Sequence, residues 1–225
     1  EVERFTAMGV VRQEPACRHF GECGGCRWQD ISYEDQLALK ERMVKNAFAA
    51  RGFADLSIRP ILPSVSPFFY RNKMEFSFGC DREGKIQLGL HMRGRFNRVF
   101  DVEDCHLQSE ISNRVVQTAR RLAEDLGLPV YDLRTHEGLL RFLVVRETKA
   151  SDQLMVNIVV TSYPDGSVDE LVRGLVEAVP EIDVMIITLH QGKAQVAKGQ
   201  SEFVWRGIGH IEELCSGLKF EISPQ

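Results

Sequence analysis

The sequence predicts an α+β fold in which an antiparallel sheet carries its helices on one face. Between residues 99 and 189 the expected elements follow in the order β-α-β-β-α-β, which is typical of ferredoxin-like folds. A cysteine-rich loop and one further helix precede this part of the chain. We therefore expect three segments: a cysteine loop over 1–30, a helix and linker over 31–62, and an α+β domain over 63–225.

Size and composition fit this prediction. A length of 225 residues is enough for one large domain or two small ones. Hydrophobic residues make up 44% and charged residues 27%, which argues against a disordered or fibrous chain. No apolar run is long enough for a membrane-spanning helix, and residues 1–4 lack the features of a signal peptide. We expect a cytoplasmic protein without membrane contact, in a compartment that keeps thiols reduced.

The elements before residue 105 are predicted from caps, turns and periodicity. Ser32 can cap a helix over 33–52, because Asp35 stands three residues later in the capping-box position. Three prolines between 60 and 67 indicate a linker. Alternating polar and apolar residues predict a half-buried strand over 73–79. The expected hairpin partner and a short strand follow over 86–92 and 99–102.

The second half of the chain alternates helices and strands. Ser109 opens a predicted helix that ends at Gly127, and a second helix covers 168–179. Apolar runs enriched in β-branched residues predict the strands, and shorter strands are expected from there to the end of the chain. The three longer strands span 139–145, 154–160 and 184–189.

The spacing of three cysteines is the strongest chemical signal. Cys17, Cys23 and Cys26 fall within ten residues, and Gly24 and Gly25 separate the last two. The glycines put no side chain between two converging thiolates and tolerate positive φ in a tight loop. Three thiolates from one loop can hold three corners of an iron–sulfur cluster, with a fourth ligand from elsewhere. Among the remaining cysteines the natural candidate is Cys105, with Cys80 and Cys215 also possible.

Other uses of these cysteines remain open on spacing alone. A zinc site could add His19 or His106, although structural zinc sites usually come as two paired knuckles and only one is present. Disulfides are disfavoured by the reducing compartment. A redox pair would be expected beside a βαβ unit, and neither Gly24 nor Gly25 helps such a mechanism.

Five motifs resemble the RNA uracil-5-methyltransferase family, and within it most of all the iron–sulfur enzymes that methylate 23S ribosomal RNA. The first motif runs from Cys17 through Cys23-Gly-Gly-Cys26 to Gln29, and the adjoining helix continues it with Tyr33, Gln36 and Lys40. The other motifs are Tyr70-Arg-Asn-Lys-Met-Glu-Phe-Ser-Phe-Gly79, Asp101-Val-Glu-Asp-Cys105-His-Leu, Gly138-Leu-Leu-Arg-Phe-Leu-Val-Val-Arg146 and the segment from Ile211 to Pro224.

The resemblance implies an S-adenosylmethionine-dependent enzyme that methylates uridine at C5 in RNA. It implies a [4Fe-4S] cluster on Cys17, Cys23, Cys26 and Cys105, which gives preference to Cys105 over the other two cysteines. The cluster motif favours 23S ribosomal RNA over tRNA as substrate, and we expect a monomer. In the family, the helix expected over 33–52 packs on the catalytic domain, so its apolar stripe is expected to lack its usual cover.

The residues for methyl transfer are not found in this sequence. It has no glycine-rich cofactor loop after a strand. The family's cysteine nucleophile stands in an Asp-Pro-Pro-Arg context, and no Asp-Pro occurs here. We expect a central portion, without the RNA-binding TRAM domain or the S-adenosylmethionine-binding domain, and inactive by itself. We therefore assign no catalytic and no S-adenosylmethionine-binding residue. The alternative is a stand-alone RNA-binding module that holds an iron–sulfur cluster or zinc.

A local positive stretch is the candidate RNA surface. The net charge of −4 does not indicate a nucleic-acid partner, but residues 71–98 carry seven basic and three acidic residues. Aromatic side chains among them offer stacking surfaces for unpaired bases, while the alternative is an ordinary solvated strand face. The candidate RNA contacts are Tyr70, Arg71, Lys73, Arg93, Arg95, Phe96 and Arg98.

Overall fold

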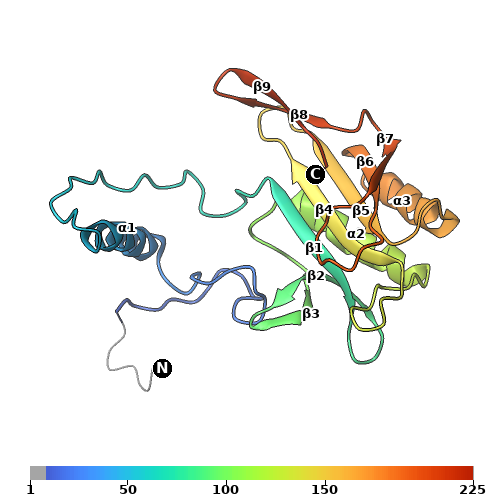
Figure 1. Cartoon of the computed structure of the whole chain (residues 1–225), viewed down its shortest axis with the longest axis horizontal. Coiled ribbons are helices and arrows are strands. Elements are labelled where there is room, and N and C mark those ends of the chain that lie inside the picture. The colour runs from blue at the N-terminus through green and yellow to red at the C-terminus, as the bar shows by residue number, and fades with distance from the viewer. Residues whose placement is uncertain (1–8, 225) are drawn as a thin grey trace.

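A seven-stranded mixed sheet forms the body of the molecule in the computed structural model, which describes residues 9–224 (Figure 1). The strands lie in the order β3-β2-β1-β4-β5-β6-β7, and β8 and β9 form a separate two-stranded hairpin. The strands are β1 (Lys73–Cys80), β2 (Ile86–Met92), β3 (Arg95–Asp101), β4 (Leu140–Glu147), β5 (Leu154–Val160), β6 (Ile182–Leu189), β7 (Ser201–Arg206), β8 (Ile211–Cys215) and β9 (Leu218–Ile222). The helices are α1 (Tyr33–Ala49), α2 (Glu110–Asp125) and α3 (Gly166–Ala178).

The pairing of the strands corrects the ferredoxin-like prediction. From β3 to β6 the elements do follow in the order β-α-β-β-α-β, but a ferredoxin-like sheet would place β3 inside the sheet beside β6. Instead β3 lies at the edge, where it pairs with β2, and β1 pairs with β4. The sheet is also not fully antiparallel, because β5 and β6 are joined through α3 and pair in parallel. The mixed α+β class is confirmed, whereas the sheet order is wrong.

The main core lies between one face of the sheet and the helices α2 and α3. Fully buried side chains of the strands, such as Phe76 and Leu143, share one apolar cluster with Val116 of α2 and Leu171 of α3. The prediction that the helices cover one face is therefore confirmed for α2 and α3. The expected alternation in β1 is also found, since Met74, Phe76 and Phe78 are buried.

The opposite face of the sheet carries smaller apolar clusters and one buried cation. The Arg141 guanidinium donates hydrogen bonds to the carbonyl oxygens of His190, Gly192 and Ala194 at 3.0, 2.5 and 2.8 Å. It also lies 4.2 Å from the centroid of the Tyr131 ring. The side chain thus fixes the loop between β6 and β7, and burial lowers its pKa.

Helix α1 extends away from the sheet (Figure 1). Its predicted cap is confirmed, because the Ser32 hydroxyl oxygen accepts a hydrogen bond from the Asp35 N–H at 3.1 Å. No residue of α1 is buried, and the apolar side chains of Met43, Val44 and Phe48 are 61%, 45% and 42% exposed. These apolar side chains of α1 are therefore uncovered in this chain. Within residues 9–224 no helix combines the length and the apolar character needed to cross a membrane.

The cysteine loop is attached to the end of β2. The Gly24 N–H donates to the His91 carbonyl oxygen at 2.9 Å, and the Arg93 N–H donates to the Glu22 carbonyl oxygen at 2.8 Å. A Cβ atom on Gly24 would lie 2.6 Å from the same carbonyl oxygen, and one on Gly25 would lie 2.7 Å from a methyl carbon of Leu90. The two glycines therefore allow the cysteine loop to lie close against β2. The positive φ of the loop is found at Gly21 instead of Gly24 or Gly25, which corrects that expectation.

Replacement of Gly24 tests this attachment. In Gly24→Ala the new methyl group overlaps a backbone oxygen, so we expect the loop to shift and the free energy of unfolding to fall by about 1–3 kcal/mol. Urea denaturation measures the stability, and hydrogen exchange at the Arg93 amide reports the loop itself. Gly166→Ala is the matched control, because a Cβ there meets nothing within 4 Å. Unchanged exchange at Arg93 in Gly24→Ala would contradict the attachment.

Candidate metal centre and nucleic-acid surface

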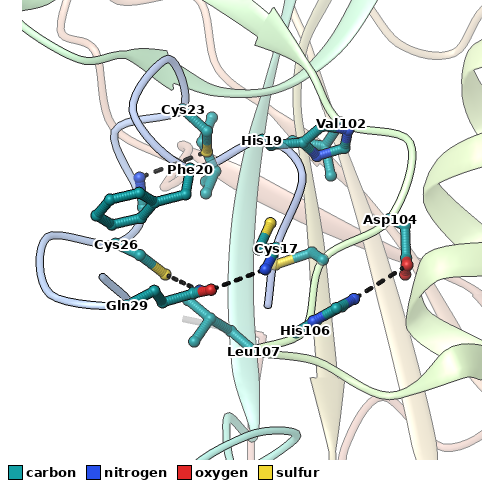
Figure 2. Close-up of a pocket in the computed structure, with 13 residues that line it drawn as sticks. Cys17, His19, Phe20, Cys23, Cys26, Gln29, Val102, Asp104, His106 and Leu107 are labelled. Atoms are coloured by element: carbon teal, nitrogen blue, oxygen red, sulfur yellow. Dashed lines mark hydrogen bonds and ion pairs between the residues drawn. The ribbon is translucent and has the colours of Figure 1, made fainter. Parts of the chain in front are cut away.

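Four cysteines from two distant segments line one cavity. Cys17, Cys23 and Cys26 come from the loop before α1, and Cys105 comes from the segment between β3 and α2. Figure 2 shows Cys17, Cys23 and Cys26 around the cavity, with His106 and Asp104 at its other side. Cys80 and Cys215 do not line this cavity, and both are exposed. The fold thus brings together the four cysteines that the sequence motifs singled out.

Two amide side chains hold the cysteines in place. The Gln29 side chain accepts a hydrogen bond from the Cys17 N–H and donates one to the Cys26 sulfur, both at 3.1 Å (Figure 2). Asn113 in the first turn of α2 accepts from the Cys105 N–H at 2.9 Å and donates to the Cys105 carbonyl oxygen at 3.2 Å. One of these contacts holds the Cys26 sulfur itself, and the others fix the backbone of Cys17 and Cys105. Sequence reasoning did not single out either role, although Gln29 ends the cysteine motif.

Burial favours the protonated form of two thiols of this cavity, Cys23 and Cys105. Burial raises the pKa of Cys105 to about 11. A hydrogen bond from the Leu107 N–H lowers this pKa, and the charges of Cys26 and Cys23 add a smaller rise. Burial also raises the pKa of Cys23, while a hydrogen bond from the Gly25 N–H at 3.4 Å to its sulfur lowers it. A metal would bind here by displacing protons, since thiolates are the ligands.

The spacing of the sulfur atoms bears on which metal group fits. Within residues 9–224, the one set of three metal-ligating side chains with all ligand atoms inside 4.8 Å is His210, Glu212 and Glu221. That set lies in the β8–β9 hairpin, and Glu212 already pairs with Lys219 at 2.5 Å. No three of the cysteine sulfurs among the described residues form such a set. Four cysteines are nevertheless a donor set of the kind that iron–sulfur clusters use.

The two histidines considered as zinc ligands have other contacts. His19 lines the cavity, and its ring packs on Phe100 with centroids 5.1 Å apart. Burial, assisted by the charge of Arg18, lowers the pKa of His19. His106 forms a pair with Asp104 at 3.2 Å and lies near the rings of two phenylalanines. Both histidines thus line the cavity and pack against neighbouring aromatic rings.

An arginine-lined hollow adjoins the cysteine loop. We call it the arginine hollow; its volume is about 680 Å³, and its walls are the loop from Gly24 to Arg27, Arg71, and the chain from Leu90 to Phe96. Among the described residues, no carboxylate lies within ion-pair distance of the four arginines that line it, which are Arg27, Arg71, Arg93 and Arg95. Phe96 is 83% exposed at its edge. Such a surface suits the phosphates and unpaired bases of a nucleic acid.

The structure divides the seven candidate RNA contacts. Four of them line the arginine hollow: Arg71, Arg93, Arg95 and Phe96. Tyr70 lines a neighbouring hollow, Arg98 lines a separate one with Arg82, and Lys73 is paired with Glu75. The structure adds Arg27, which the sequence reasoning missed because it stands in the cysteine motif and outside the basic stretch.

Comparison with known proteins gives similarity along almost the whole chain. No family model matches. The chain is 38% identical to an uncharacterized RNA methyltransferase of Caldanaerobacter subterraneus, over 99% of this chain and 50% of that protein. It is 36% identical to a protein of the same description from Chlorobaculum tepidum, over 94% of this chain and 47% of that protein. The chain therefore spans about half the length of the curated relatives that it matches.

A solved structure shares the fold. The crystal structure of Pyrococcus abyssi tRNA (uracil-54, C5)-methyltransferase in complex with S-adenosyl-L-homocysteine matches with a TM-score of 0.69. The two are 21% identical over 95% of this chain and 46% of that one. The homologues of this chain are thus named RNA methyltransferases, and the chain corresponds to about half of each. Its fold is that of part of a tRNA methyltransferase.

Proposed function

We propose that this chain is the cluster-binding and RNA-positioning part of an S-adenosylmethionine-dependent enzyme that methylates uridine at C5. The observation that carries the proposal is the placement of four cysteines on one cavity directly beside the arginine hollow. The names of the homologues support an RNA substrate, and the solved structure with the same fold is a uracil C5 methyltransferase. The cysteine motif favours 23S ribosomal RNA, and tRNA is the competing substrate.

Each segment of the chain has its own role in this proposal. Residues 1–30 bind a [4Fe-4S] cluster through Cys17, Cys23 and Cys26, and the domain over 63–225 supplies Cys105 and most of the arginine hollow. When bound, the cluster would connect these two segments through iron–sulfur bonds and so fix a loop that has few core residues. Gln29 and Asn113 orient the ligating cysteines, and the arginines hold the RNA backbone.

Methyl transfer itself is assigned to no residue of this chain. The chain spans about half the length of its relatives, and the described residues offer no glycine-rich cofactor loop of the kind that binds S-adenosylmethionine. We propose that it does not transfer methyl groups by itself. The test is a methylation assay of the complete gene product with labelled S-adenosylmethionine on 23S ribosomal RNA and tRNA transcripts. Label at uridine C5 in 23S RNA alone is expected, and label in neither RNA would overturn the proposal.

Iron analysis tests the cluster. We expect the protein purified without oxygen to be brown and to hold about four irons per chain. Cys105→Ser removes a ligand from the second segment, so the iron should be lost, while the exposed Cys80→Ser should keep it. Circular dichroism of both variants shows whether the fold is retained. A colourless protein that contains zinc, or equal iron in the two variants, would contradict the assignment.

Salt-dependent RNA binding tests the arginine hollow. Arg93→Ala should weaken the binding of 23S ribosomal RNA fragments by a similar factor whatever their sequence. It should also reduce the slope of log affinity against log salt concentration by about one. The reason is that one phosphate contact, and the counterions released with it, are lost. Arg82→Ala is the matched control, because it removes the same charge from the basic stretch outside the hollow. Fluorescence anisotropy at several salt concentrations measures both, and equal slopes would refute the role of the hollow.

A further inference from the structure

A second hollow lies on the other side of the cysteine loop. We call it the aromatic hollow; its volume is about 490 Å³, and four aromatic residues line it: Trp28, Tyr33, Phe68 and Tyr70. One wall is the end of the cysteine loop and the start of α1, and the other is the extended segment 64–70. The two hollows share Gly25, Cys26 and Arg27 as a common wall.

Hydrogen bonds fix both walls of the aromatic hollow. The Gln36 side chain donates to the carbonyl oxygens of Trp28 and Ile31 at 2.9 and 3.0 Å, which ties α1 to the cysteine loop. The Ser64 N–H donates to the Tyr33 hydroxyl oxygen at 2.8 Å and joins the two walls. On the far side, the N–H of Phe69 donates to the His106 carbonyl oxygen at 2.8 Å. The hollow is therefore built into the fold and connected to the segment that carries Cys105.

The lining of the hollow suits one class of ligand. Aromatic side chains stack on the faces of unpaired bases, and the volume is that of a small-molecule pocket, far too small for a helix of RNA. Tyr70 is 52% exposed, so its ring is accessible. Lys40 and Arg27 line the hollow, and among the described residues neither has a carboxylate within ion-pair distance. Positive charge beside aromatic rings favours a nucleotide over an apolar ligand.

The aromatic hollow lies directly beside the arginine hollow. Tyr70 and Arg71 are consecutive in the chain, yet Tyr70 lines the aromatic hollow and Arg71 lines the arginine hollow. We propose that the aromatic hollow receives one unstacked base of an RNA strand whose neighbouring phosphates occupy the arginine hollow. This inference rests on the proposed RNA-binding function, and it adds a base-binding subsite formed by the cysteine loop, α1 and segment 64–70.

A pair of oligonucleotides separates base binding from phosphate binding. The probes are an eight-nucleotide single-stranded uridine RNA and an abasic ribose-phosphate strand of the same length and charge. Stacking of one base predicts that the anaerobically purified chain binds the base-bearing strand about fivefold to a hundredfold more tightly. Tyr70→Ala should remove this preference, and Tyr70→Phe should retain it. Phe53→Ala is the matched control, because that aromatic side chain is 60% exposed and lies outside both hollows.

Tryptophan fluorescence gives a second readout. Trp28 lines the aromatic hollow, whereas Trp205, the other tryptophan of the chain, lies on β7 and donates to Asp169. In a Trp205→Phe background, the base-bearing strand should quench Trp28 and the abasic strand should not. Equal binding of both strands would overturn the base subsite and leave the proposed RNA function standing. The base subsite would also be overturned if Phe96→Ala lost the preference for the base-bearing strand while Tyr70→Ala kept it. Failure to bind either strand would count against the proposed RNA function itself.

Discussion

The backbone pairing between the cysteine loop and the end of β2 is the contact on which the candidate site depends. Two hydrogen bonds, from Gly24 to His91 and from Arg93 to Glu22, join segments that are about seventy residues apart. They place Cys23 and Cys26 beside Cys105, and they make Arg27 a neighbour of Arg93 and Arg95. The absence of a Cβ on Gly24 is the condition for this approach.

The same pairing explains why two hollows of different character lie side by side. The loop from Gly25 to Arg27 separates the two hollows and lines both of them. On the side toward β2, the arginines of the β2–β3 turn line the arginine hollow. On the side toward α1, aromatic residues line the aromatic hollow. Segment 64–70 closes the second side because backbone hydrogen bonds hold it to the chain around Cys105. The cysteine cavity therefore shares part of its wall, at Gly25 and Cys26, with both hollows.

Local features of the fold could be predicted, and non-local pairings could not. Ser32 and Ser109 cap their helices as expected, because a cap involves only residues of the first turn. Strand β3 begins at Arg95, four residues before the predicted start at Val99, because Arg95 pairs with Met92 of β2. The order of strands in the sheet was predicted wrongly because alternation identifies a buried face and carries no information about which strand lies next to it.

The sequence by itself determined the residue types of the candidate site: four cysteines in two motifs, a basic stretch, and aromatic residues before it. Only the tertiary structure decided which of them meet. Arg27, Gln29 and Asn113 join the site through strand pairing and helix packing, while Lys73 and Arg98 are directed elsewhere. The physical reason is that proximity across the sheet depends on register and order between distant segments, whereas residue chemistry and spacing are local properties of the chain.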